Sequence, residues 1–233
     1  MSKYDTYREN VLRVSQALSE DGYFGTRTGS GGNVSVLIDD EDAIAITPSG
    51  KPYESLKPSD ICIVGLDQKW IECPSEPSVE TGMHIAVYQN RRDVNSVIHT
   101  HQPYASVFAL MNEPIPALFD EVAITIGPIV EVVPYGLSGS PELLANVVSK
   151  LGNRCHCYIL QNHGAISIGR NLDKTAHYVE LLEKTACAYY RALSTGRPVT
   201  VLPEEVAMGI FEFTKCSQDM EIARKDSLAA KAQ

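Results

Sequence analysis

The amino-acid sequence predicts a single α/β domain, on three observations. Apolar residues near the N-terminus recur at three- and four-residue steps, the spacing of a helix that buries one face. Short runs rich in Val and Ile follow, joined by turns rich in Asp, Gly, Pro and Ser, as expected of strands. No repeat or Pro/Ser-rich linker divides the 233 residues, of which 44% are hydrophobic. We therefore expect one domain over residues 1–233, with one large core.

The first expected elements are a helix and three strands. The helix covers residues 4–20, and a glycine follows it as a stop signal. Its apolar positions and the glycine are Tyr4, Tyr7, Val11, Val14, Leu18 and then Gly22. The strands are expected at residues 34–38, 43–47 and 61–65.

Helices and strands alternate through the rest of the chain. The expected helices cover residues 81–88, 104–111, 141–151 and 172–193, and the expected strands cover residues 94–101, 129–133 and 157–161. Pro141 stands at the first turn of its helix, where a missing backbone N–H is tolerated. This alternation is the basis of the predicted α/β class.

Three histidines form the most informative pattern in the chain. His99 and His101 lie in a Val- and Ile-containing run before Pro103, and alternate residues of a strand project to the same side. His163 follows the 157–161 run, and Gly164 after it lets the backbone approach a ligand closely. Three neutral nitrogens on one ion leave a coordination position open, as in catalytic zinc sites. Considered by spacing alone, the histidines could equally be ordinary surface residues.

Glu80 strengthens the metal interpretation. It opens the expected 81–88 helix, which runs directly into the strand that carries His99. The carboxylate could therefore act near the metal as a general base or as a displaceable fourth ligand. The alternative is an ordinary acidic residue in the first turn of a helix, where it interacts favourably with the helix dipole.

Several turns could hold an anion. Glycine-rich turns with hydroxyl and amide side chains present N–H and O–H donors without bulk in the way. The same residue types are also what ordinary turns are made of. The candidate residues are Gly32, Asn33, Ser49, Gly50 and Ser78.

Five linked motifs reveal a family resemblance. In chain order they are Gly32-Asn33-Val34-Ser35, Thr47-Pro48-Ser49-Gly50, Pro77-Ser78-x-Glu80 with His84, His99-x-His101 and Asn162-His163-Gly164. The chain resembles the class II aldolases of the L-fuculose-phosphate aldolase and L-ribulose-5-phosphate 4-epimerase superfamily. The resemblance covers residues from about 10 to about 215 and is thinnest after Pro203. It implies a three-layer α/β/α fold with a largely antiparallel sheet, and a homotetramer with active sites at the subunit interfaces.

The resemblance also implies roles for individual residues. His99, His101 and His163 would bind Zn²⁺, although imidazole ligands also accept other divalent transition metals. Glu80 would be the acid/base at the reacting carbon. The residues of the candidate anion turns, from Gly32 to Ser78, would bind the phosphate of a small sugar phosphate substrate. The implied reaction is reversible cleavage of a ketose 1-phosphate to dihydroxyacetone phosphate and an aldehyde through a metal-stabilised enediolate.

The sequence departs from the family at three positions. Val79 stands where the fuculose-type enzyme has a second serine, and Asp120 and Cys216 fall where it has tyrosines. Asp120 is a candidate acid/base, or simply a solvated acidic residue. These departures leave a decarboxylase, a dehydratase and a 4-epimerase open as alternatives, although a glutamate at position 80 favours the aldolase branch over the epimerases. A non-catalytic interaction module is a further alternative, against which a base beside an open metal position argues.

Composition excludes some other functions. The formal charge of −9, from 29 acidic and 20 basic residues, argues against nucleic-acid binding. No apolar run approaches the ~20 residues of a membrane span, and the polar start is unlike a secretory signal. The six cysteines do not form a disulfide framework, and Cys155-His156-Cys157 is expected to belong to a strand and its entry. We therefore expect a cytoplasmic protein that interacts with neither membrane nor nucleic acid.

Overall fold

The computed structural model describes residues 2–26, 31–38 and 41–232, and it has the predicted α/β class. The helices are α1 (Asp5–Glu20), α2 (Thr81–Asn90), α3 (Pro103–Met111), α4 (Asp120–Thr125), α5 (Pro141–Lys150), α6 (Leu172–Leu193) and α7 (Glu204–Ala232). The strands are β1 (Asn33–Ile38), β2 (Ala43–Ile46), β3 (Cys62–Gly65), β4 (Trp70–Glu72), β5 (Ser96–Thr100), β6 (Ile115–Pro116), β7 (Ile129–Val130), β8 (Val132–Val133), β9 (Cys157–Leu160) and β10 (Gly164–Gly169). Short 3₁₀ turns cover Tyr53–Ser55, Pro58–Asp60 and Leu151–Asn153.

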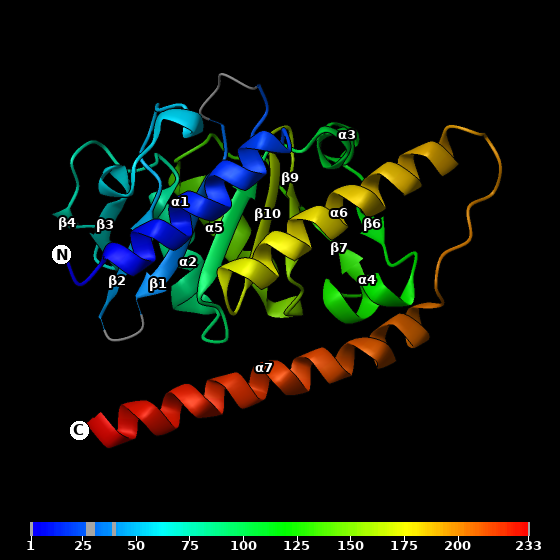
Figure 1. The fold of residues 1–233 in the computed structure, drawn as a ribbon. Coiled ribbons are helices and arrows are strands. Elements are labelled where there is room, and N and C mark those ends of the chain that lie inside the picture. The colour runs from blue at the N-terminus through cyan, green and yellow to red at the C-terminus, as the bar shows by residue number, and fades with distance from the viewer. Residues whose placement is uncertain (1, 27–30, 39–40, 233) are drawn as a thin grey trace.

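The molecule has three layers around one large sheet (Figure 1). Eight strands follow the order β4-β3-β2-β1-β5-β10-β9-β8, and neighbouring strands are antiparallel except for β8 and β9. Helices α1 and α6 cover one face of this sheet, and α2 and α5 cover the other. The expected α/β/α architecture with a largely antiparallel sheet is confirmed. The small β6-β7 sheet lies beside α3, α4 and the end of α6.

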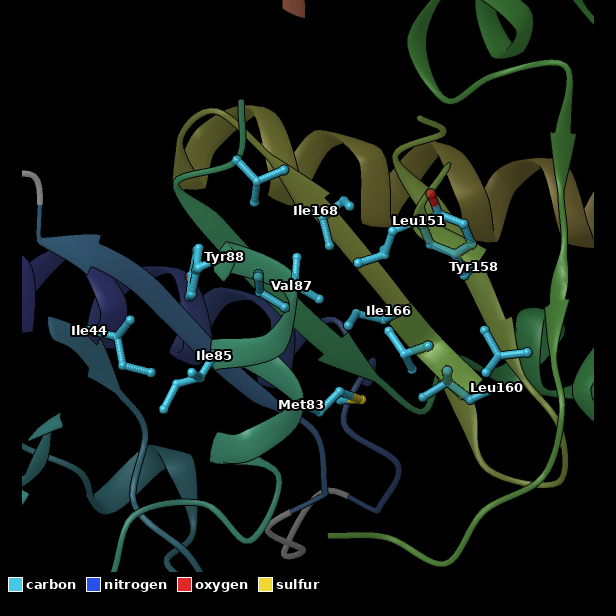
Figure 2. Packing of buried hydrophobic residues seen from close by; sticks show 14 of the residues in the cluster. Ile44, Met83, Ile85, Val87, Tyr88, Leu151, Tyr158, Leu160, Ile166 and Ile168 are labelled. Carbon is cyan, nitrogen blue, oxygen red and sulfur yellow. The ribbon is translucent and has the colours of Figure 1, made fainter. Parts of the chain in front are cut away.

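The core packs on both faces of the sheet. Figure 2 shows the α2 side, where Met83, Ile85 and Val87 of the helix face the apolar side chains of Ile44 and Ile166 from the strands. Burying an aliphatic side chain of this size contributes roughly 1.5–3 kcal/mol. A second cluster packs α1 against the opposite face of the sheet. These two clusters fix α1 and α2 on either side of the central strands.

Alternation along β5 places its histidine. Val97 packs in the cluster on the α2 side and Ile98 in the cluster on the α1 side. Because successive strand side chains point to opposite faces, His99 lies on the same face as Val97. The neighbouring strand β1 pairs Asn33 directly with His99. Both polar side chains are therefore directed toward the face that α2 covers.

The structure corrects two expected strands. The single strand predicted over residues 129–133 is two strands, because β7 pairs with β6 whereas β8 pairs with β9. The strand predicted to end at His101 ends at Thr100, and the backbone N–H of His101 donates instead to the carbonyl of Tyr23 at 2.8 Å. Both differences concern pairing partners, which a local sequence pattern does not specify. Among the described residues, no helix combines the length and apolarity needed to cross a bilayer.

Candidate metal centre

The three predicted histidines meet at one end of the central strands. His99 lies near the end of β5, His101 directly after it, and His163 in the turn between β9 and β10. One ring nitrogen from each lies within 4.8 Å of the others. The three rings meet edge-on or tilted, with centroids 4.6–5.3 Å apart. Such a cluster can supply three nitrogen ligands to one ion.

The backbone fixes which nitrogen of His99 faces the cluster. Its Nδ1 donates to the carbonyl oxygen of Ala165 at 2.9 Å, and the neighbouring residue of β10, Ile166, pairs with His99 in the sheet. Burial lowers the pKa of His99 to about 4, so the ring is neutral near pH 7. Its Nε2 therefore carries a lone pair, and it lies 3.0 Å from Nε2 of His101. This is the ligand form of histidine, oriented by a backbone hydrogen bond.

Glycines make room for the ring of His101. A Cβ on Gly31 would lie 2.8 Å from Nδ1 of His101, and a Cβ on Gly164 would lie 2.9 Å from Cδ2 of the same ring. A Cβ on Gly164 would also lie 2.2 Å from the carbonyl oxygen of Thr100. The glycine in the Asn-His-Gly motif is thus required by close packing of the ring and the backbone.

The donor set fits a divalent transition metal. Oε2 of Glu80 lies 3.2 Å from Nε2 of His99, and Oε1 lies 3.5 Å from Nε2 of His163. The carboxylate and the unprotonated nitrogen of His99 are both electron-pair donors, so together they can bind a cation between them. Nδ1 of His163 is buried and has no hydrogen-bond partner in the described part of the chain. Three imidazoles and a carboxylate are typical zinc ligands.

Glu80 is held from two sides at the N-cap of α2 and is only 3% exposed. Nδ2 of Asn33 donates to its Oε2 at 2.8 Å, and Oγ of Ser138 donates to its Oε1 at 3.0 Å. Burial raises the pKa of Glu80, but His99 and the hydrogen bond from Asn33 lower it by more, so the net pKa lies below its usual range. The carboxylate is therefore ionised and has a fixed orientation.

A chain of buried hydrogen bonds continues behind Asn33. Its Oδ1 accepts from Nε2 of His84 at 2.5 Å. Nδ1 of His84 lies 2.7 Å from Oγ of Ser35, which lies 2.7 Å from the hydroxyl of Tyr88. Burial lowers the pKa of His84 to about 3, so this ring is neutral. The amide of Asn33 thus connects Glu80 to this chain, a different set of partners from the phosphate expected from the sequence.

The other candidate anion residues lie in two neighbouring loops and at the start of β1. Pro48 and Pro77 form an isolated β-bridge, which brings Ser49 and Gly50 beside Ser78. The backbone N–H of Ser78 donates to Thr47 and that of Ser49 donates to Glu76. Gly32 has a positive φ of 68°, and a Cβ there would lie 2.4 Å from the ring of Phe24. A left-handed backbone and this close contact both require glycine there.

The site differs from the prediction at two further residues, Asp120 and Ser138. Asp120 is exposed in the first turn of α4, and none of the hydrogen bonds found in the described residues connects it to Glu80 or the histidines. Ser138, in contrast, contacts Glu80, and the sequence analysis did not identify it. Its Ser-Gly-Ser context before Pro141 indicates a turn, but no local signal places that turn against Glu80.

Comparisons with known proteins agree with this geometry. Residues 9–190 match the family described as Class II Aldolase and Adducin N-terminal domain. The 5-deoxy-D-ribulose 1-phosphate aldolase of Bacillus thuringiensis is 35% identical over 198 residues, covering 85% of this chain and 90% of the relative. The L-fuculose phosphate aldolase of Escherichia coli K12 is 37% identical over 193 residues, covering 81% and 86%. A solved L-fuculose 1-phosphate aldolase superimposes with a TM-score of 0.82 at 32% identity, covering 92% of this chain and 98% of the other.

Proposed function

Because the chain belongs to the class II aldolase family, we propose that it is a zinc-dependent aldolase that reversibly cleaves a ketose 1-phosphate to dihydroxyacetone phosphate and an aldehyde. The chain is accordingly a carbon–carbon lyase. One observation carries the proposal: an ionised, buried carboxylate, Glu80, lies 3.2 Å from a ligand nitrogen of the histidine cluster. A non-catalytic scaffold has no need for a base beside an open metal position.

His99, His101 and His163 are the proposed ligands of the metal. A bound divalent ion would act as a Lewis acid on the substrate carbonyl and stabilise the enediolate. In the condensation direction, Glu80 removes the proton from the hydroxymethyl carbon of dihydroxyacetone phosphate. Asn33 keeps this carboxylate ionised and oriented before the transfer.

The substrate phosphate is proposed to bind between the two neighbouring loops. Ser49, Gly50 and Ser78 lie there together, with Gly32 and Asn33 at the adjacent start of β1. Gly50 has a positive φ, and no atom lies within 4 Å of a Cβ added there, so this turn leaves room for a ligand. Hydroxyl and backbone N–H donors of this kind can hold an anion.

We further propose a homotetramer of single-domain subunits, with residues 1–233 in one domain and active sites at the subunit interfaces. Exposed apolar side chains support an assembly, because exposed apolar patches mark interaction sites. They include Leu110 on α3 and Phe213, Met220 and Leu228 on α7. The six free cysteines are compatible with the proposed cytoplasmic location.

A separate acid/base group is needed at the aldehyde oxygen, where it would take the hydroxyl proton during cleavage and return it during condensation. Asp120 is the candidate proposed from the sequence, and its exposure on α4 leaves it accessible to a neighbouring subunit. A decarboxylase, a dehydratase or a 4-epimerase would use the same metal and base with a different bond broken.

Proton exchange tests the aldolase proposal directly. Dihydroxyacetone phosphate is incubated in heavy water with zinc-loaded or chelator-treated protein, and loss of the hydroxymethyl proton signal is followed by NMR. Zinc-dependent exchange is expected, because Glu80 would remove the carbon-bound proton and the ion would supply the Lewis acid that this step needs. Absence of exchange with zinc verified in the protein would contradict the proposal and favour one of the related reactions.

A further inference from the structure

The two oxygens of Glu80 have different surroundings. Oε2 accepts a hydrogen bond from the amide of Asn33. Asn33 is buried and belongs to the hydrogen-bond chain that continues through His84. Oε1 accepts a hydrogen bond from the hydroxyl of Ser138 and lies 3.5 Å from Nε2 of His163. Because the donor to Oε2 is a buried amide that His84 also holds, whereas the donor to Oε1 is an exposed hydroxyl, Oε1 is the oxygen better placed to take up a proton.

Ser138 belongs to a loop, residues 134–140, that is held firmly against Glu80. Ser140 accepts from the N–H of Leu143 as the N-cap of α5, and its own N–H donates to Leu137 at 2.9 Å. Gly139 has a positive φ of 74°, and a Cβ there would lie 2.9 Å from the carbonyl oxygen of Val79. The glycine thus allows the loop to pack directly on the residue before Glu80.

Ser138 links a buried group to solvent. Glu80 is 3% exposed, whereas Ser138 belongs to the exposed surface. In the absence of substrate, water can also approach Oε1 past His163, which is partly exposed. Substrate bound beside the histidines fills that approach, and the hydroxyl of Ser138 is then the contact of Oε1 that faces outward.

We propose that Ser138 is a positioning residue that orients Oε1 of Glu80 and carries the proton taken up by this oxygen to bulk water. This inference rests on the proposed aldolase function. The proton from the substrate carbon binds Oε1 and forms the carboxylic acid. That acid then donates its proton to Oγ of Ser138 while the hydroxyl proton of Ser138 passes to a water molecule. Carboxylate and hydroxyl are both regenerated, and one proton has reached solvent.

Exchange and condensation place different demands on this relay. Deuterium exchange of dihydroxyacetone phosphate requires the proton on Glu80 to reach solvent. Aldol condensation conserves protons overall, because one proton leaves the substrate carbon and one joins the aldehyde oxygen, so it needs no net release of a proton to solvent. The ratio of the exchange rate to the condensation rate therefore reports on the relay, whereas a general structural defect lowers both rates together.

The experiment compares zinc-loaded wild type, Ser138→Ala, Ser138→Thr and Ser140→Ala. Exchange is measured by NMR in heavy water, and condensation is measured with whichever of acetaldehyde, glycolaldehyde and lactaldehyde the wild type accepts. We expect the ratio to fall at least tenfold in Ser138→Ala and to be preserved in Ser138→Thr, which keeps the hydroxyl. Ser140→Ala alters the same loop without touching Glu80 and should keep the wild-type ratio.

The outcomes separate this inference from the function on which it rests. A wild-type ratio in Ser138→Ala, whatever the absolute rates, overturns the relay. An equal fall in Ser138→Ala and Ser140→Ala also overturns it, because the loop and not the hydroxyl would then be responsible. Failure of the zinc-loaded wild type to exchange or condense overturns the aldolase function itself, before any substitution is considered.

Discussion

Nε2 of His99 and Oε2 of Glu80 lie 3.2 Å apart although neither carries a proton near pH 7. The other ring nitrogen of His99, Nδ1, donates a hydrogen bond to the carbonyl oxygen of Ala165. A neutral histidine and an ionised carboxylate facing each other in this way offer two lone pairs to a cation between them. This pair therefore ties the metal site to the proposed base.

Removing a ligand should remove the metal. His101→Ala is expected to lose stoichiometric zinc, because two imidazoles and one carboxylate hold the ion far less tightly than the full set. His177→Ala is the matched control, since His177 is an exposed histidine on α6. Zinc per chain is measured by elemental analysis after gel filtration. One tightly held zinc in His101→Ala would exclude this residue as a ligand.

Glu80→Gln should separate metal binding from catalysis. The amide has nearly the same shape but cannot accept the substrate proton, and loss of a general base typically costs 10²–10⁴-fold in rate. We expect zinc to remain bound while exchange of dihydroxyacetone phosphate falls at least ~100-fold. Both quantities are measured on the same preparation. Wild-type exchange in this variant would mean that another group is the base.

Asn33→Ala should impair Glu80 more than phosphate binding. It removes the donor to Glu80 and the acceptor of His84, and each buried unpaired group costs about 1–3 kcal/mol of stability. A displaced base should lower kcat by roughly 10²-fold, equally for phosphorylated and unphosphorylated dihydroxyacetone. Ser49→Ala is the comparison and should raise KM for the phosphorylated form. An effect of Asn33→Ala confined to phosphorylated substrate would instead favour the phosphate role.

Local pattern was sufficient to predict part of this fold. The apolar spacing of residues 4–20 gave a helix that the structure has at Asp5–Glu20, and the helix expected over residues 172–193 is present at Leu172–Leu193. Strand alternation correctly placed His99 on one face beside a turn. Each of these depends on neighbours within a few residues, which a sequence displays directly.

The strand partners and side-chain contacts that join residues far apart in the chain could not be predicted from this one sequence. The run 129–133 is uniformly suited to a strand, yet its halves join different sheets. Similarly, Asn33 and Ser138 meet Glu80 from 47 and 58 residues away, and only the packed sheet brings them together. Their residue types are equally compatible with ordinary turns, so the sequence alone could not reveal these contacts.

Gly164→Ala should damage both stability and metal binding. The added Cβ would lie 2.2 Å from the carbonyl oxygen of Thr100 and 2.9 Å from His101, so backbone or ring must move. Overpacking of this kind typically costs ~1–3 kcal/mol, and a displaced His101 weakens the zinc site. Gly152→Ala is the control, because no atom lies within 4 Å of its added Cβ. Thermal unfolding with and without zinc checks both effects, and unchanged melting would refute the packing argument.

Acid should destabilise the metal-free protein through His156. Burial lowers its pKa to about 4, its Nδ1 donates to Thr125, and its Nε2 accepts from Gln218 of α7. Between pH ~6.5, where the unfolded chain protonates, and pH ~4, where the folded ring does, the unfolded state binds the extra proton. The stability contribution of the neutral ring is therefore full above pH ~6.5 and lost as pH falls, by ~1.4 kcal/mol per unit.

His156→Gln isolates this contribution, because glutamine retains hydrogen-bonding capacity but does not titrate. Urea unfolding with chelator present, between pH 7.5 and 4.5, gives the difference in unfolding free energy between wild type and variant. We expect this difference to be constant above pH ~6.5 and to move in favour of the variant below it. Buried histidines common to both proteins, such as His84, cancel in the difference. A difference that does not change with pH would show that His156 protonates equally in the folded and unfolded states.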